Sequence, residues 1–273
     1  MIGDAISPPF FQGSFASIDD VMTNGANPFD LDPWLDTAKF RLQHLLTAAK
    51  QKYFVSESHL WPFFGTIAAL AATHGRLSIL DFGGGIGDNF VQWTSVAPAA
   101  LTTRVEYYIV DTRRNCEIGD ESLSDCGHAV RFIESSKFLD AAPELHYDAA
   151  MLCGVLQYMT DWRSAIRTIA QRTKRFVYIT RTQLNEDVPT FYTRQLLSPE
   201  TGPWAGKFIG ETAAAIINPS ELRLALAEEG FEEIIGMVLY DYRHAAINHS
   251  GASAEVYQGM TLFERRSGLQ SPA

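Results

Sequence analysis

The stretch Leu80–Gly87, which reads LDFGGGIG, is the most informative part of this chain. The apolar run Leu77–Leu80 leads into it and is typical of a buried strand. After Asp81, a glycine occupies every second position, which gives the pattern Asp-x-Gly-x-Gly-x-Gly. Glycine loses much conformational entropy on folding, so this density indicates a loop whose backbone passes close to a ligand, where a Cβ would collide.

Two alternative interpretations of the glycines stay open. A dinucleotide-binding loop requires G-x-G-x-x-G, and counting from Gly83 puts Asp88 in place of the third glycine. A carboxylate there would repel a pyrophosphate, whereas Asp81 suits a cofactor that carries an ammonium and a sulfonium. A nicotinamide-dependent reductase is therefore the less favoured enzyme, and a glycine-rich turn without a ligand is the remaining alternative.

Composition narrows the class of protein further. The chain has 273 residues, a formal net charge of −10 and 46% hydrophobic residues, as expected for one large α/β domain with additions. The acidic balance argues against a nucleic-acid partner, which needs clustered Lys and Arg. Three cysteines without a CxxC pair fit a reducing compartment, and neither a signal peptide nor a bilayer-spanning run is recognised. We expect a cytoplasmic protein with a small-molecule substrate and no membrane partner.

The pattern along the chain predicts two parts. Residues 1–55 form an irregular arm with scattered phenylalanines followed by a helix over 33–52, and this arm makes a homodimer a reasonable expectation. Residues 56–273 form the main domain, interrupted at 181–218 by an aromatic, proline-rich insertion that we expect to be a lid or wall over a substrate site. Strands are predicted at 77–81, 105–111, 130–134, 147–154, 175–180, 233–240 and 258–265, and helices at 61–73, 88–95, 162–172 and 219–229.

Alternating strands and helices imply a mainly parallel sheet with helices on both faces. The last two strands follow each other with only a loop between them, which predicts an antiparallel hairpin at the sheet edge. Ligands in such sheets bind outside the carboxyl ends of the strands, which is where the glycines lie.

Four places carry a resemblance to a known family: Asp81–Gly87, Tyr108–Asp111, Cys153–Tyr158 and Tyr178–Thr182. Together they resemble the class I S-adenosylmethionine (SAM)-dependent methyltransferases, and within them a bacterial family whose substrates are undefined. The resemblance extends over about residues 56–266. It implies a Rossmann-like seven-stranded sheet and SAM as the cofactor. The Asn/Asp-Pro-Pro-Tyr/Phe signature of nucleic-acid amino methylases is absent at Gly154–Tyr158 and the chain is acidic, so we expect methyl transfer to a small-molecule acceptor, at oxygen rather than nitrogen.

The resemblance also assigns cofactor-binding positions. Asp111 ends the second strand, where the family's acidic residue accepts hydrogen bonds from the ribose hydroxyls; a turn-capping aspartate is the alternative. Of Glu134, Ser135 and Ser136, Ser135 is our choice for the adenine amine. The full predicted cofactor set is Asp81, Gly83, Gly85, Gly87, Asp111, Ser135, Gly154 and Gln157.

Methyl transfer to oxygen needs a base for the acceptor's proton. His59, His244 and His249 are the candidates, although each could be an ordinary surface histidine. Tyr158 and Arg181 follow the fourth and fifth strands and complete the predicted catalytic set, with core packing and ion pairing as their alternatives. No carboxylate cluster follows the fourth strand, so no metal is predicted. A catalytically silent, methyltransferase-like scaffold remains the alternative function.

Overall fold

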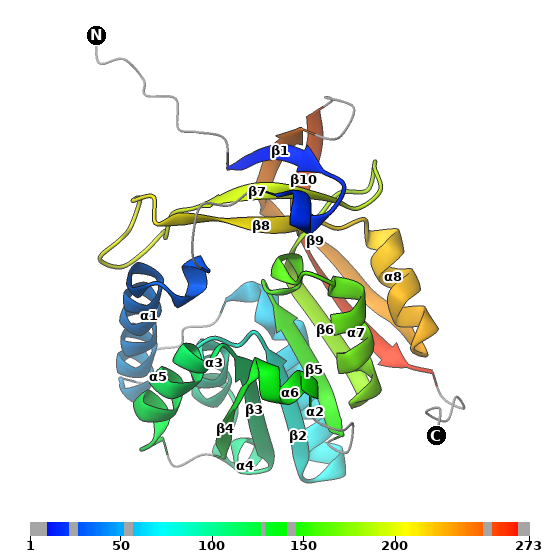
Figure 1. Ribbon diagram of the computed structural model, residues 1–273. Helices are drawn as coiled ribbons and strands as arrows, with labels where there is room; N and C mark the ends of the chain where they lie inside the picture. Colours follow the sequence, from blue (N-terminus) through cyan, green and yellow to red (C-terminus); the bar gives the residue numbers. More distant parts are fainter. Residues whose placement is uncertain are drawn as a thin grey trace.

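The computed structural model describes residues 10–21, 27–51, 57–126, 129–140, 146–247 and 253–266. Within these ranges the chain forms a large sheet with helices on both faces and a smaller sheet above one edge (Figure 1).

The large sheet has the strand order β4-β3-β2-β5-β6-β10-β9. Strands β2 to β6 run parallel, while β10 pairs antiparallel with both β6 and β9. This is the Rossmann-like sheet of class I methyltransferases, and the predicted hairpin at its edge is confirmed. The strands are β2 (Leu77–Phe82), β3 (Val105–Asp111), β4 (Val130–Glu134), β5 (Tyr147–Cys153), β6 (Thr173–Leu184), β9 (Phe231–Ile247) and β10 (Ser253–Arg265).

Helices pack on the two faces of this sheet because the central strands are apolar on both sides. One face is covered by α1 (Asp32–Lys50), α2 (Trp61–His74) and α3 (Asp88–Val96). The other is covered by α6 (Ser135–Asp140), α7 (Trp162–Gln171) and α8 (Pro219–Glu228). The short α4 (Ala99–Thr102) and the helix α5 (Arg113–Leu123) flank β3 in the sequence.

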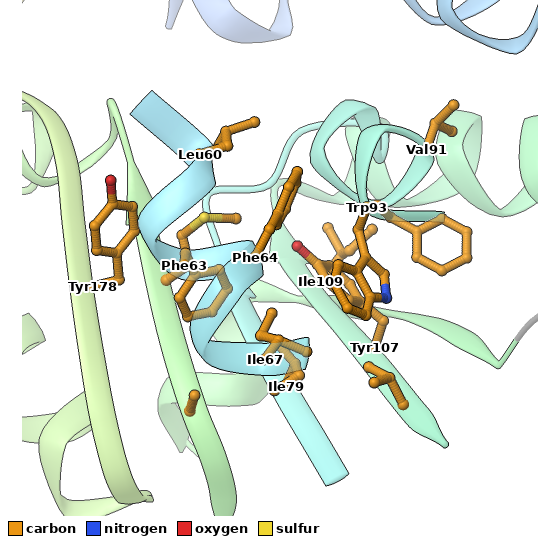
Figure 2. Close-up of a cluster of buried hydrophobic side chains, with 14 of the residues drawn as sticks. Leu60, Phe63, Phe64, Ile67, Ile79, Val91, Trp93, Tyr107, Ile109 and Tyr178 are labelled. Carbon is orange, nitrogen blue, oxygen red and sulfur yellow. The ribbon is translucent and has the colours of Figure 1, made fainter. Parts of the chain in front are cut away.

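The core on the α2 side is built around aromatic side chains (Figure 2). Phe63 of α2 stacks on Tyr178 of β6 with ring centroids 5.5 Å apart, and Phe64 packs on Trp93 of α3 at 5.7 Å. Each fully buried apolar side chain of this size contributes roughly 1.5–3 kcal/mol. This packing fixes α2, and the short helix η3 (Ser58–Leu60) before it, against the middle of the sheet.

A second sheet, with the order β1-β7-β8, lies beyond the carboxyl ends of the parallel strands (Figure 1). Its strands are β1 (Phe11–Phe15), β7 (Phe191–Leu197) and β8 (Gly210–Ile216). All its pairings are antiparallel, so the N-terminal segment is a strand added to the insertion. The sequence predicts this segment as irregular, and the structure differs because its partner strand lies far away in the sequence and leaves no local signal.

Two further differences concern the end of β6 and a helix that was not predicted. The sequence ends the fifth strand at Thr180, but β6 continues to Leu184 because β10 pairs with it as far as that residue. The polar stretch after Asp111 forms α5, whose narrow buried stripe is Asn115, Cys116, Gly119 and Leu123. Gly119 is a poor helix former, but a Cβ there would lie 2.3 Å from the Phe132 ring, so glycine permits close contact between α5 and β4.

Candidate functional site

A cavity of about 1660 Å³ lies where the carboxyl ends of β2, β3 and β5 meet the second sheet and α1. Pockets for a single small ligand typically measure about 300–1,000 Å³. The cavity is therefore large enough for two ligands side by side. Its walls include the glycine loop after β2 and residues of β6, β7, β8 and β10.

The glycine loop adopts a backbone that only glycine accommodates well. Gly83, Gly85 and Gly87 have φ angles of +76°, +60° and +105°. A Cβ at Gly83 would lie 2.4 Å from Val155, whereas a Cβ at Gly85 would meet no protein atom within 4 Å. Gly85 lines the cavity, so the empty space beside it is a cradle that a ligand can fill.

Asp81 lies beneath this loop and does not line the cavity. Its side chain is fully buried, and its Oδ2 accepts hydrogen bonds from Tyr107 Oη at 3.1 Å and Asn89 Nδ2 at 3.2 Å. A Cβ at Gly84 would lie 2.7 Å from its carboxylate, so loop and carboxylate are in direct contact. Burial, only partly offset by the two hydrogen bonds, raises the pKa of Asp81 to about 7. The structure thus makes Asp81 a support of the loop.

Asp111, at the end of β3, lines the cavity and holds the loop from the other side. Its Oδ2 accepts from the backbone N–H of Gly85 at 2.8 Å, and its Oδ1 accepts from Thr112 N at 2.7 Å and Asn115 Nδ2 at 2.6 Å. A carboxylate offers about four acceptor positions, so one position on Oδ2 remains. Burial raises the pKa of Asp111, and the three N–H donors oppose this rise.

The remaining predicted cofactor residues also lie near the loop. Ser135 is the first residue of α6 and lines the cavity. Glu134 does not line it; its carboxylate forms an ion pair with Lys137 and accepts a hydrogen bond from Ser136 Oγ. Gly154 has a φ of +66° and lines the cavity after β5. Gln157 is buried and donates from Nε2 to the carbonyl oxygen of Gly154 at 3.0 Å. Gly87 forms the N-cap of α3 behind the cavity wall.

His59 lines the cavity from η3 and is the only described histidine that does so. Its Nδ1 lies 3.4 Å from a carboxylate oxygen of Glu57, and its Nε2 lies 3.6 Å from the sulfur of Cys153. Tyr178 Oη donates to its backbone carbonyl, which fixes its position. Burial is the main cause that lowers its pKa to about 4, although the Glu57 carboxylate opposes this. The imidazole is therefore neutral near pH 7.

Burial also raises the pKa of the Cys153 thiol to about 12, so this thiol stays protonated. A protonated thiol donates to the Nε2 of His59, and the ring hydrogen is then assigned to Nδ1, where Glu57 accepts it. The unprotonated ring nitrogen of His59 is thus Nε2, which faces Cys153, and Cys153 also lines the cavity. Neither Glu57 nor Cys153 is in the predicted site, because nothing in their sequence spacing pairs them with His59.

Arg181 occupies an unusual position in β6. Thr180 pairs with Met260 and Thr182 pairs with Gly259, so Arg181 is the extra residue of a β-bulge. Its φ of +55° makes it the one described non-glycine residue with a left-handed backbone. Its guanidinium lines the cavity and lies 3.4 Å from a carboxylate oxygen of Glu57. Strain of this kind is typical of functional positions.

Tyr158 lies in the short helix η4 (Leu156–Tyr158) and lines the cavity beneath the second sheet. Its hydroxyl donates to Gln195 Oε1 of β7 at 3.1 Å, and its ring lies 4.8 Å from that of Phe29. Burial raises its pKa, so it stays protonated.

Two of the predicted bases, His244 and His249, lie partly or wholly outside the described residues: of His244 the side chain, and of His249 the whole residue. Other cavity residues were not predicted, among them Arg41 of α1, which forms an ion pair with Asp88. Within the described ranges no three His, Cys, Asp or Glu side chains gather in a way that could hold a metal ion. No described helix is both long and apolar enough to cross a membrane.

Comparison with known proteins agrees with this architecture. A family model described as "Methyltransferase domain" matches residues 51–234, which is more than half of the chain. The chain therefore belongs to the methyltransferase-domain family. No curated protein sequence matches it.

Three solved methyltransferase structures are among those similar to this chain. The CcbJ methyltransferase from Streptomyces caelestis is 12% identical, with 75% of this chain and 89% of that chain covered and a TM-score of 0.50. A SAM-dependent methyltransferase from Clostridium acetobutylicum is 10% identical, with 84% and 99% covered and a TM-score of 0.49. The magnesium protoporphyrin IX methyltransferase from Synechocystis, solved with S-adenosylhomocysteine, is 12% identical, with 86% and 97% covered and a TM-score of 0.48. At 12% identity, the likeness to the Streptomyces caelestis enzyme concerns the fold alone.

The buried carboxyl of Asp81 generates a prediction about stability. Its pKa in the folded protein, about 7, lies above the unfolded value of 3.8, so its contribution to stability is lost as pH rises from about 4 through about 7. Asp81→Asn should remove this dependence and make the variant more stable than the parent at pH 8, by at most about 4 kcal/mol. Denaturant unfolding at several pH values measures it.

Asp120→Asn, on the exposed face of α5, is the control for loss of one carboxylate. It should leave the pH dependence unchanged. Parallel stability profiles for the parent and Asp81→Asn would show that the Asp81 carboxyl is not neutralised by burial.

The left-handed backbone at Arg181 generates a second prediction. Arg181→Gly should be more stable than Arg181→Ala by about 1 kcal/mol, because both lose the guanidinium but only glycine relieves the strain. Denaturant unfolding of the two variants isolates this difference. An alanine variant as stable as the glycine variant would contradict a strained bulge.

Proposed function

We propose that this protein transfers a methyl group from SAM to a small-molecule acceptor at an oxygen atom. The observation that carries the proposal is the cradle at Gly85, which a Cβ would fill and which lies beside the acceptor position left on Asp111. A loop of this shape, at the carboxyl edge of a parallel sheet, is where this fold binds its ligand.

The residues present fit SAM, because the space beside Gly85 is open and Asp111 Oδ2 keeps an acceptor position. The loop at Gly83–Gly87 would lie along the methionine part of the cofactor, and Asp111 Oδ2 would accept a hydrogen bond from a ribose hydroxyl. Ser135 would face the adenine amine, and Gly154 and Gln157 would line the region of the methyl group. When bound, SAM supplies a methyl group on a positively charged sulfur, which is a good leaving group.

The protein's contribution is to orient the acceptor, exclude water and receive a proton. The second sheet closes the cavity above η4, and we propose that this insertion acts as the lid or wall. A hydroxyl acceptor loses its proton as it is methylated. The Nε2 of His59 is the base that would take it, after the acceptor hydroxyl has replaced the Cys153 thiol as the donor to the one lone pair of this nitrogen. Glu57 holds the opposite ring nitrogen and would stabilise the imidazolium that forms. Tyr158 stays protonated and would position the acceptor.

Arg181 acts in this proposal through Glu57. Its guanidinium pairs with the same carboxylate that holds His59, and the positive charge opposes protonation of the ring. The bulge fixes where this arginine lies. We therefore assign Arg181 as a residue that positions Glu57 and His59, rather than as a binder of an acidic acceptor.

The glycine cradle is tested by substitution. Gly85→Val should abolish binding of S-adenosylhomocysteine while the fold survives, because the new side chain would enter the cavity and its Cβ would meet no protein atom within 4 Å. Calorimetric titration measures the affinity, and circular dichroism reports the fold. Unchanged affinity would rule out this loop as the cofactor site.

Gly206→Val is the matched control. Gly206 also has a positive φ, of +70°, and a Cβ added there would meet no atom within 4 Å, but it does not line the cavity. This variant incurs a similar backbone cost and should bind S-adenosylhomocysteine as the parent does.

The proposed base is tested by the pH dependence of the reaction. Because the pKa of His59 is lowered to about 4, its neutral form persists on acidification, and kcat/KM should stay level down to about pH 5. His59→Gln should lower kcat and leave the affinity for S-adenosylhomocysteine unchanged. An acidic limb centred near pH 6.5, or full activity of His59→Gln, would exclude His59 as the base.

A further inference from the structure

Two glutamine side chains line the cavity, and no group in the described part of the chain donates a hydrogen bond to their carbonyl oxygens. Gln183 of β6 and Gln258 of β10 are directly opposite each other in the antiparallel pairing, and both line the cavity. Gln183 is only 2% exposed. The Oε1 atoms of both are buried and accept no hydrogen bond within the described structure. Each such oxygen costs roughly 1–3 kcal/mol, which a ligand can recover.

The bulge at Arg181 explains how Gln183 comes to face the cavity. Tyr178 packs in the core on the α2 side of the sheet, and Leu184 packs in the core on the opposite side. Tyr178 and Leu184 are six positions apart, and in a regular strand, where side chains alternate between the faces, they would lie on the same face. The extra residue reverses the alternation after Thr180, so that Gln183 faces the α2 side and the cavity. The strained backbone thus serves to present this amide.

A third glutamine and a group of aromatic rings complete this part of the cavity. Tyr158 donates to the carbonyl oxygen of Gln195, so the group that Gln195 would offer a ligand is its amide NH₂, a donor. Phe29 lies 5.0 Å from the ring of Trp34 and 4.8 Å from that of Tyr158, and all three rings line the cavity. Amides and flat apolar surfaces therefore face the same space.

Both of the described arginines that line the cavity, Arg41 and Arg181, are paired with a carboxylate. Three carboxylates each face an arginine, which cancels their field, and all three line the cavity: Asp88 with Arg41, Glu57 with Arg181, and Glu211 with Arg194. An anionic acceptor would find no unpaired arginine among the described lining residues, and an apolar acceptor would leave the glutamine amides unbonded.

We infer that the acceptor is a neutral ring bearing several hydroxyl groups, of the kind found in a pyranose sugar. A hydroxyl both donates and accepts, and so does an uncharged amide, which makes the two groups complementary. Cross-strand neighbours such as Gln183 and Gln258 have Cβ atoms about 4.5–5.5 Å apart, which suits two hydroxyls of one ring. The C–H face of such a ring is apolar and packs on aromatic surfaces. This inference rests on the proposed function, because it names the acceptor of that reaction.

The test is a binding experiment on the full chain with and without saturating S-adenosylhomocysteine. The probes are free hexoses and deoxyhexoses, methyl hexopyranosides, and nucleotide diphosphate hexoses, which separate a free ring from one attached to a larger molecule. Catechol, benzoate and butylamine represent apolar phenolic, anionic and cationic acceptors. Calorimetry or saturation-transfer NMR detects binding.

Saturable binding of at least one sugar class is the expected result. Gln183→Leu and Gln258→Leu should each weaken it about tenfold or more and leave the affinity for S-adenosylhomocysteine unchanged. Thr182→Val is the matched control, because Thr182 neighbours Gln183 in β6, also has an unbonded buried hydroxyl, and does not line the cavity. It should bind the sugar as the parent does.

The possible failures can be told apart. If S-adenosylhomocysteine binds but no sugar does, or if the leucine variants bind the sugar as tightly as the parent, the inferred acceptor class is wrong while the cofactor site stands. If a sugar binds but S-adenosylhomocysteine does not, the proposed methyl transfer is wrong while the carbohydrate site stands.

Discussion

The hydrogen bond from the backbone N–H of Gly85 to the carboxylate of Asp111 ties together the ends of two neighbouring strands. It requires the chain to turn sharply after β2, which the positive φ angles of Gly83 and Gly85 allow. The buried Asp81 carboxyl supports the same turn from below, in contact with Gly84. A side chain at any of these glycines would move the loop, close the cavity or strain the backbone. The place for a cofactor is thus a consequence of backbone geometry rather than of reactive side chains.

The other half of the cavity depends on a different constraint, the bulge at Arg181. One extra residue in β6 does two things at once. It directs a guanidinium at the Glu57 carboxylate that holds His59, and it reverses the strand so that Gln183 faces the cavity. The second sheet then closes this side through the bond between Tyr158 and Gln195. The glycine loop and the bulge lie at the same edge of the large sheet, where the parallel strands end, and this brings the two halves of the cavity together.

The sequence predicts the large sheet well, because its strands are continuous apolar runs and its helices have regular apolar spacing. The helix α3 and the strand β3 appear where these patterns indicate, and so does the hairpin of β9 and β10, although both of its strands are longer than the predicted 233–240 and 258–265. The glycines of the loop are equally visible, since their spacing is itself the signal. In contrast, α5 is so polar that its narrow buried stripe escapes a search for apolar periodicity.

The acceptor side of the site could not be predicted in the same way. Gln183 follows a bulge that depends on pairing with the distant Gly259, and strand alternation alone would turn it away from the cavity. Gln195 and the strand β1 belong to a sheet whose strands come from distant segments. His59 was a candidate, but its partners Glu57 and Cys153 are brought to it by the packing of α2 and by the end of β5. Long-range pairing, which leaves no local pattern, explains each of these gaps.

Calorimetric titration of the parent protein shows whether the glycine loop binds SAM. S-adenosylhomocysteine, NADH and NADPH are titrated separately into the full chain. We expect saturable binding of S-adenosylhomocysteine in the micromolar range and no binding of either nicotinamide cofactor. Binding of NADH or NADPH, or no binding of S-adenosylhomocysteine, would contradict this expectation.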